Sequence, residues 1–212
     1  MRPIPEQLPG NDPTWRADLL VLARGLIVYG AKPKIVRRYT GVTKKDTRDL
    51  YLLLHGTPAS CGPATQGKAT FFTTARNGSH GSATSWNIQG SIFLRCYLDI
   101  AKLSSQPMNK GWLLLQAFEE YKRQTEKLAQ SANIKRLDIN QAFALLVLAG
   151  GTSVAEYADI GLIHCKHCDR EYLVNKTREL ATQPCPFETM QKTYKRRLET
   201  CISNYQNRTV AA

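Results

Sequence analysis

Three cysteines near the C-terminal end place the tightest constraint on what this chain can fold into. Cys165 and Cys168 are separated by two residues. Cys185 follows after the gap of roughly 15–20 residues that zinc-ribbon spacing requires. A fourth cysteine at position 188 would complete a ribbon, but that position is Glu188. Residues 163–188 therefore predict a metal site with three thiolates and one acidic residue in place of four thiolates.

Other uses of this cysteine pair fit the sequence less well. Haem attachment needs a histidine after the second cysteine, and the residue there is Asp169. A thioredoxin-type redox pair opens a long helix, whereas the DREYLV segment that follows has the pattern of a short strand. We therefore expect one structural Zn²⁺ in a zinc-ribbon-like module over residues 163–190, with Glu188 at the spacing of the fourth ligand. Three further residues compete for that position: His164, His167 and Cys201. The alternative is a degenerate site that has lost its metal.

The charge of the chain points to its partners. The formal net charge is +12 over 212 residues, which indicates a polyanionic partner, most often nucleic acid and sometimes an anionic membrane surface. The alternative is a basic surface that binds nothing. We find no signal peptide and no run of the roughly 18–20 apolar residues that span a membrane. We therefore expect a cytoplasmic protein without a membrane partner, in which the six cysteines stay reduced.

A glycine-containing turn separates two basic amphipathic segments in the N-terminal part of the chain. Pro33 is tolerated in the first turn of a helix. Gly41 permits the left-handed conformation of a tight turn, and Thr43 can cap the helix that follows. Two helices joined by such a turn within about twenty residues form a helix-turn-helix. We predict this arrangement for residues 14–57.

The second of these helices carries residue types that reach phosphates and base edges in the major groove. We expect DNA contacts on its exposed side from Thr43, Lys44, Lys45, Thr47 and Arg48. The preceding segment and the C-terminal tail supply further predicted DNA-binding residues: Lys32, Lys34, Arg37, Arg38, Lys195, Arg196 and Arg197. The alternative is an ordinary helical hairpin with a solvated basic face.

The remaining segments complete a mainly α fold class, a helical domain with the small C-terminal module. The predicted organisation in chain order is a flexible arm (1–13), the helix-turn-helix region (14–57), a joint or long loop (58–90), a helical core (91–162), the ribbon-like module (163–190) and a basic tail (191–212). Within the core, apolar periodicity predicts helices at residues 91–100, 112–130 and 139–149.

A stretch inside the joint resembles a nucleotide-binding motif without meeting its requirements. The joint is predicted because residues 56–87 are rich in Gly, Ser, Thr and Pro, a composition that indicates a long loop with room for one short helix. Residues 62–69 nearly match a phosphate-binding loop, but Ala69 stands where the metal-binding hydroxyl is needed. A buried strand should also precede such a loop, and a helical pattern precedes it here. We therefore expect no nucleotide site.

The order of these features resembles the FlhC family, the C-subunit of the bacterial flagellar master activator. The local similarity is clearest in residues 29–58 and 162–185, and the resemblance covers most of residues 17–197. It implies a transcription activator that forms a hetero-oligomer with a smaller FlhD-like subunit, binds double-stranded DNA upstream of promoters and recruits RNA polymerase. It also implies a zinc ion held by four cysteines. This chain has Glu188 in place of the fourth cysteine, a departure that suggests a divergent member of the family. Relatives on conjugative elements activate transfer genes instead of flagellar genes.

Two other function classes fit parts of the sequence. A zinc-dependent nuclease or hydrolase could use Glu188 as the general base beside a metal-bound water, but cysteine-dominated sites are usually closed and structural. An RNA-binding protein would also be basic, but the chain lacks the aromatic-rich strand of an RNP motif. The sequence therefore predicts a DNA-binding activator subunit without catalytic residues.

Overall fold

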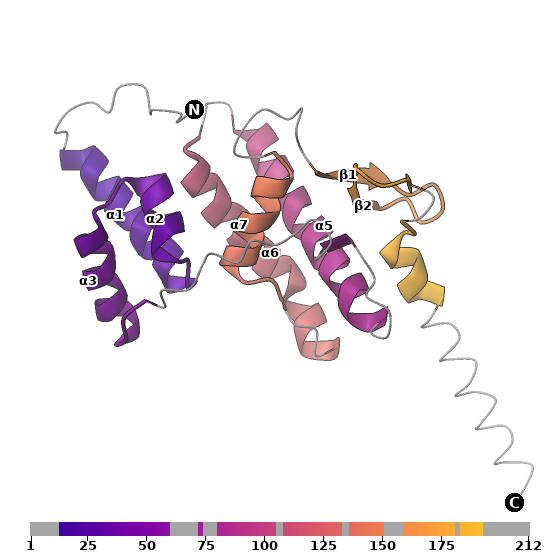
Figure 1. Ribbon diagram of the computed structural model, residues 1–212, viewed down its shortest axis with the longest axis horizontal. Coiled ribbons are helices and arrows are strands. Elements are labelled where there is room, and N and C mark those ends of the chain that lie inside the picture. The colour runs from indigo at the N-terminus through magenta and orange to yellow at the C-terminus, as the bar shows by residue number, and fades with distance from the viewer. Residues whose placement is uncertain are drawn as a thin grey trace, which may run out of the picture. The chain divides into compact units, whose positions relative to one another are not determined.

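The computed structural model describes residues 13–59, 72–73, 80–104, 108–132, 136–150, 159–180 and 183–192. Its elements, in chain order, are α1 (Pro13–Val28), α2 (Pro33–Thr40), α3 (Lys44–His55), α5 (His80–Leu103), α6 (Lys110–Ala132), α7 (Ile139–Leu148), β1 (Ile160–His164) and β2 (Glu171–Asn175) (Figure 1). This part of the chain is mainly helical with a two-stranded sheet, so the predicted mainly α class is confirmed.

The chain divides into two compact units that do not follow the sequence in two consecutive blocks. The first unit comprises residues 1–66, 96–124 and 138–144, and the second comprises residues 67–95, 125–137 and 145–212. Consequently α5, α6 and α7 each contribute residues to both units.

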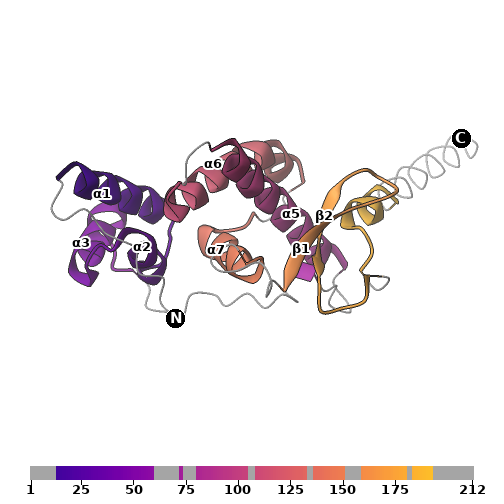
Figure 2. The same ribbon diagram turned by 90° about the horizontal axis from the view of Figure 1, so that it is seen from above.

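In the first unit, α1 packs against α2 and α3, and α2 packs against α3 (Figure 1 and Figure 2). The core of these helices includes fully buried aliphatic side chains: Leu22, Leu26, Ile27, Ile35 and Val36. α6 approaches α1 closely, because a Cβ atom on Gly25 would lie 2.6 Å from Cδ2 of Leu115. Burial of one apolar face of each helix is the reason that apolar periodicity predicts these helices.

The turn between α2 and α3 is built from local signals. Pro33 opens α2, where its missing amide proton has no helical partner to lose. Gly41 adopts φ 66°, a left-handed conformation, and its amide donates a 3.0 Å hydrogen bond to the carbonyl of Arg37. Thr43 Oγ1 accepts a 3.1 Å hydrogen bond from the amide of Asp46 and so caps α3. The predicted helix start, turn glycine and cap are confirmed.

Side chains from elsewhere in the first unit fix the corner between α1 and α2. Asn140 Oδ1, from α7, accepts a 2.8 Å hydrogen bond from the amide of Lys32, and Asn140 Nδ2 donates a 3.1 Å bond to the carbonyl of Gly30. The Tyr51 hydroxyl donates to the carbonyl of Ala31. Main-chain groups that leave the helical hydrogen-bond pattern at this corner thereby gain partners.

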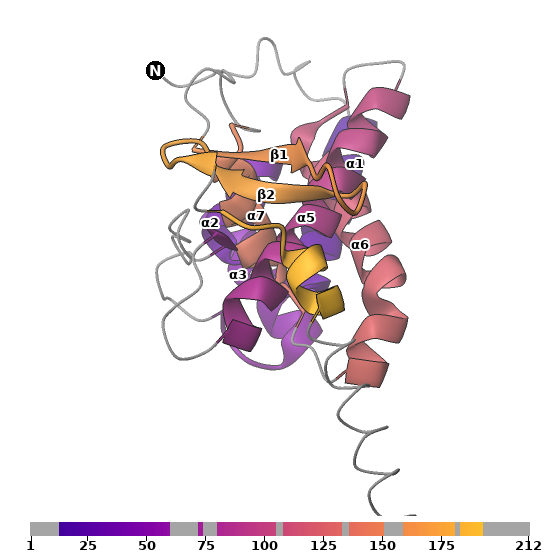
Figure 3. The ribbon, with the colours of Figure 1, turned by 90° about the vertical axis from the view of Figure 1, so that its right-hand side faces the viewer.

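In the second unit, β1 and β2 form an antiparallel pair (Figure 3). The register pairs Ile160 with Asn175 at one end and His164 with Glu171 at the other. Four of the five residues of β2 lie in the DREYLV segment, so the short strand predicted there is confirmed.

The part of α5 that belongs to the second unit supplies hydrogen-bond partners for β2. Asn87 Nδ2 donates a 2.8 Å bond to the carbonyl of Leu173, and Ser91 Oγ accepts a 3.0 Å bond from the amide of Leu173. Gly90 lies so close to the strand that a Cβ atom there would be 2.6 Å from Leu173 Cδ1. Small and polar residues of α5 therefore allow the helix to contact the strand directly.

Two predicted boundaries were wrong, and the contacts of the second unit explain both. α5 begins at His80, so the predicted loop over residues 56–87 is helical from position 80 onward. Glycine, serine and threonine favour loops, but here packing against β2 overrides that preference. β1 begins at Ile160, inside the predicted helical core. An apolar run this short has no periodicity that distinguishes a strand from a helix.

The other predictions of secondary structure agree with the fold or fall on residues that the structure does not describe. The helices predicted at 91–100, 112–130 and 139–149 coincide with α5, α6 and α7 apart from their ends. Pro13, the last residue of the predicted arm, is the first residue of α1. The following lie outside the described residues: 1–12, 62–69 and 193–212, with Lys195, Arg196, Arg197 and Cys201.

Candidate functional site

Three cysteine side chains meet in the second unit. The Sγ atoms of Cys165, Cys168 and Cys185 all lie within 4.8 Å of one another, and those of Cys168 and Cys185 are 3.6 Å apart. Thiolates at about 2.3 Å from a tetrahedral metal ion are about 3.8 Å apart. The predicted trio of cysteines is therefore arranged as a soft metal ion such as Zn²⁺ requires, and these residues could hold one.

The loop after β1 brings Cys165 and Cys168 together. The amide of Cys165 donates a 2.9 Å hydrogen bond to the carbonyl of Arg170, and the amide of Asp169 donates a 3.1 Å bond to the carbonyl of Cys165. Asp169 adopts φ 57°, a left-handed conformation that aspartate tolerates better than most residues. This tight turn directs both sulfur atoms to one side.

Backbone amides and burial act differently on two of the thiols. Hydrogen bonds from the amides of His167 and Cys168 lower the pKa of Cys165, because they stabilise the thiolate. Burial raises the pKa of Cys185 to about 11, although amides of Glu188 and Phe187 stabilise its thiolate. Amides of the loop after β1 thus stabilise the Cys165 thiolate, and amides that follow Cys185 stabilise its thiolate. A bound cation would offset the cost of burying Cys185 as an anion.

An apolar cluster encloses the cysteine trio. Its buried members are Ile88 of α5, Cys165, Tyr172 and Val174 of β2, Cys185 and Phe187. Burial of Cys165 and Cys185 in this cluster restricts access by water and holds their side chains in place. Cys165 and Cys185 are consequently part of the core of the second unit as well as potential ligands, and the partly buried Cys168 packs against this cluster.

The other proposed ligands lie outside the trio. The Glu188 carboxylate forms a 2.6 Å ion pair with Lys192, which lowers the pKa of Glu188. His164 Nε2 lies 3.2 Å from Oδ1 of Asp169, and the side chain of His167 is exposed. Among the described residues, only the three cysteines form a group that could hold a metal ion. The structure therefore does not bring Glu188 into the site that its spacing predicted.

Gln183 positions the third cysteine, a role that no sequence motif indicates. Its side chain accepts a 2.6 Å hydrogen bond from the amide of Asn175 and donates a 2.9 Å bond to the carbonyl of the same residue. The Tyr172 hydroxyl donates a 3.2 Å bond to the carbonyl of Gln183. Gln183 therefore ties the segment before Cys185 to β2. Neither Gln183 nor Asn87 belongs to a motif, so only their burial between distant segments identifies them.

A second candidate site is the basic surface of α2 and α3 in the first unit. Five predicted DNA-binding cations are exposed: Lys34, Arg37, Lys44, Lys45 and Arg48. None of these five forms an ion pair with another described residue. Arg38 is exposed, but its guanidinium lies 5.6 Å from the centre of the Phe143 ring. Lys32 is half-buried. Positive charge is therefore exposed at the start of α3 and along α2.

The two threonines of the predicted DNA surface differ from their expected role. Thr47 is fully buried, and its hydroxyl donates a 2.8 Å hydrogen bond to the carbonyl of Thr43. The prediction that Thr47 faces solvent was therefore wrong, because its Cβ lies on the same face of α3 as Tyr51, which is also buried. Thr43 is exposed, but its hydroxyl is engaged as the cap.

The outward side of α3 presents two chemically different faces. Lys45, Arg48 and Leu52 recur at helical spacing and share one face. Asp46, Asp49, Leu50 and Leu53 share the other face in the same way. The positive charge of α3 is therefore concentrated on one side of the helix.

Comparison with known proteins adds no relative. No protein-family model matches the chain, and no curated protein is significantly similar to it. In the described part of the chain, none of the helices has the length and apolar character needed to cross a lipid bilayer.

Proposed function

We propose that the chain is a DNA-binding subunit that acts through the basic surface of α2 and α3. The observation that supports this most directly is the set of five exposed cations without ion pairs on two helices joined by a three-residue turn. Lysine and arginine side chains at such positions neutralise phosphates and release counterions. A helix-turn-helix that places α3 in the major groove would let Lys45 and Arg48 reach base edges.

Hydrogen bonds hold the helices of this surface in place, which suits a surface that positions its cations for binding. Thr43 caps α3, and Asn140 and Tyr51 secure the corner before α2. A rigid backbone loses little further conformational freedom on binding, so the ordering cost is confined to the side chains. In this proposal the first unit presents its cations in a fixed arrangement to the phosphate backbone.

We further propose that Cys165, Cys168 and Cys185 hold a structural zinc ion. When bound, zinc would link the loop after β1 to the segment that contains Cys185 and add its binding free energy to folding. The amides of His167, Cys168, Phe187 and Glu188 stabilise the thiolates. Glu188 stands beside this trio as an ion-paired neighbour.

The order of features along the chain supports an activator of the FlhC type. On this proposal the chain forms a hetero-oligomer with an FlhD-like subunit, binds promoter-upstream DNA and recruits RNA polymerase for flagellar or conjugative-transfer genes. Co-expression with the adjacent reading frame, followed by native mass measurement and a promoter mobility shift, tests the partner and the promoter together. Recovery of the chain without that partner would contradict the hetero-oligomer.

DNA binding itself is tested by fluorescence anisotropy with a labelled duplex at several salt concentrations. The double variant Lys45→Ala/Arg48→Ala should bind at least about tenfold more weakly, and the slope of log K against log[salt] should fall by about 2. The matched control is Lys102→Ala/Lys110→Ala, which removes the same charge from exposed positions outside α2 and α3. Equal losses in both double variants, or tighter binding to single-stranded RNA, would contradict the proposal.

A further inference from the structure

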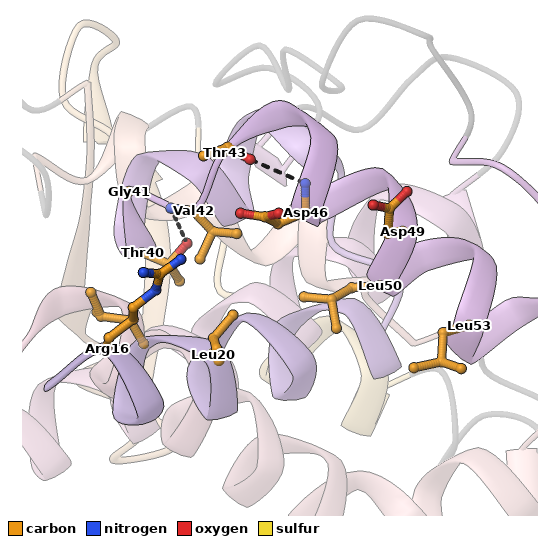
Figure 4. Close-up of a pocket in the computed structure, with 11 residues that line it drawn as sticks. Arg16, Leu20, Thr40, Gly41, Val42, Thr43, Asp46, Asp49, Leu50 and Leu53 are labelled. Atoms are coloured by element: carbon orange, nitrogen blue, oxygen red, sulfur yellow. Dashed lines mark hydrogen bonds between the residues drawn. The ribbon is translucent and has the colours of Figure 1, made fainter. Parts of the chain in front are cut away.

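A groove in the first unit lies between α1 and α3, beside the turn that joins α2 to α3. Its volume is about 710 Å³. Figure 4 shows Arg16 and Leu20 on the α1 side, and Asp46, Asp49, Leu50 and Leu53 on the α3 side. The acidic and apolar face of α3 therefore forms one wall of the groove.

The groove exposes large apolar side chains. Leu20 is 40% exposed and Leu53 is 79% exposed. Contiguous exposed leucines at a concave surface are typical of protein interaction sites. A small molecule is usually enclosed by its site, whereas Leu53 stands almost entirely in solvent. A longer apolar surface would be needed to cover both residues.

The charges that border the groove are arranged on opposite sides. Asp46 and Asp49 lie on α3, and Arg16 lies on α1. Within the part of the chain that the structure describes, none of these three side chains forms an ion pair. Two unpaired carboxylates on one wall are notable in a chain of net charge +12. They would attract a cationic group locally, although the chain as a whole repels cations.

We propose that this groove binds an amphipathic helix of a partner protein. The helix would place leucine-like side chains at i, i+3 or i+4 and i+7 against Leu20, Leu50 and Leu53. Lysine or arginine at one edge would face Asp49, and an acidic residue at the other edge would face Arg16. The distance along α3 from Asp46 to Leu53 is about 10 Å, or two helical turns, which matches two to three such anchors.

This site is distinct from the proposed DNA contact, because the groove is lined by the face of α3 next to the one that carries Lys45 and Arg48. Neither site requires the other, so loss of one leaves the other testable. If both faces were occupied, α3 would contact a nucleic acid and a protein on neighbouring sides.

The experiment measures binding of two labelled synthetic helical peptides to the full chain by fluorescence anisotropy. Both peptides carry the same leucine face and a glutamate at the edge that would face Arg16. The residues at the other edge are lysine in one peptide and glutamate in the other. Charge attraction to a chain of net charge +12 would favour the glutamate peptide. The proposal predicts the reverse preference near physiological salt, where charges more than about 8 Å apart are largely screened.

Matched variants assign the binding to the groove. Leu53→Glu should weaken the lysine peptide by about tenfold or more, because an apolar contact is replaced by a charge. Leu52→Glu makes the same change at the neighbouring exposed residue outside the groove and should change binding by less than about twofold. Asp49→Lys should reverse the preference between the peptides, whereas Asp18→Lys, which does not line the groove, should not.

Three outcomes would overturn the proposal: tighter binding of the glutamate peptide to the unaltered chain, equal loss in the Leu52 and Leu53 variants, or binding of neither peptide. Far-ultraviolet circular dichroism of each variant checks that the helices remain folded. Sedimentation of the unaltered chain and of Leu53→Glu tests a second copy as the occupant. Self-association that Leu53→Glu abolishes would assign the groove to that copy instead.

Discussion

The turn between α2 and α3 and the cysteine trio are both built around small loops, but they depend on very different parts of the chain. The proline, the glycine and the cap that shape the turn all lie between Pro33 and Asp46. The trio depends in addition on α5, whose Asn87 contacts a strand residue 86 positions away. A locally determined motif tolerates change elsewhere, whereas an assembled site loses its geometry when any of its segments moves.

The largest expected effect is loss of a trio member. Cys168→Ser should abolish zinc binding and lower the free energy of unfolding of the second unit by several kcal/mol, because metal binding contributes directly to folding. Elemental analysis and thermal unfolding measure both effects. The control is Cys96→Ser, a buried cysteine outside the trio, which should retain its zinc. If Cys168→Ser bound as much zinc as the unaltered chain, Cys168 would not be a metal ligand.

A smaller effect should follow from Asn87→Ala. The substitution leaves the carbonyl of buried Leu173 without its 2.8 Å hydrogen bond, at a cost of about 1–3 kcal/mol. Asn140→Ala removes two hydrogen bonds from a less buried corner of the first unit and should cost less. Urea unfolding of both variants measures the difference. The opposite order would mean that the first unit relies on long-range contacts as much as the second does.

Removal of the α3 cap should have a more modest effect. Thr43→Ala leaves the amide of Asp46 without the side-chain acceptor and should lower the free energy of unfolding by about 1 kcal/mol. Thr43→Ser keeps an acceptor at that position and should restore most of the loss. Equal melting temperatures for the alanine variant and the unaltered chain would show that α3 does not depend on its local cap.

The smallest effect is expected at Glu188. Its carboxylate pairs with Lys192 on the surface, and surface ion pairs contribute little to stability. Glu188→Gln should therefore retain zinc and change the melting temperature slightly. Loss of zinc from this variant would restore Glu188 to the ligand set that its spacing predicted.

The sequence predicts what adjacent residues determine. Pro33, Gly41 and Thr43 have the roles expected of them, because each acts through its own backbone conformation or its nearest amide. Spacing also brings Cys165 and Cys168 together, since a single turn connects them. The spacing also predicts the place of Cys185, because a zinc-ribbon gap is long enough for the chain to form β2 and return to the first two cysteines.

The predictions that failed involve contacts between distant segments. Composition predicts a loop where α5 begins, because glycine, serine and threonine favour loops, whereas in the structure Gly90 lets α5 approach β2, a strand far along the chain. Residue type alone places Thr47 in solvent, because it does not tell which face of a helix is buried. Gln183 and Asn87 could not be identified, because ordinary amide residues become important only when folding places them against a strand.

The side-chain partners of β2 have a consequence for solubility. β1 pairs with one edge of β2, while Asn87 and Ser91 bond to Leu173, and Gln183 bonds to Asn175, on the other edge. An open strand edge is a template for intermolecular pairing and aggregation. In this chain a helix and a glutamine side chain occupy the positions that a foreign strand would take. The same contacts that secure the cysteine trio therefore also protect the β2 edge of the hairpin from pairing with a neighbouring molecule.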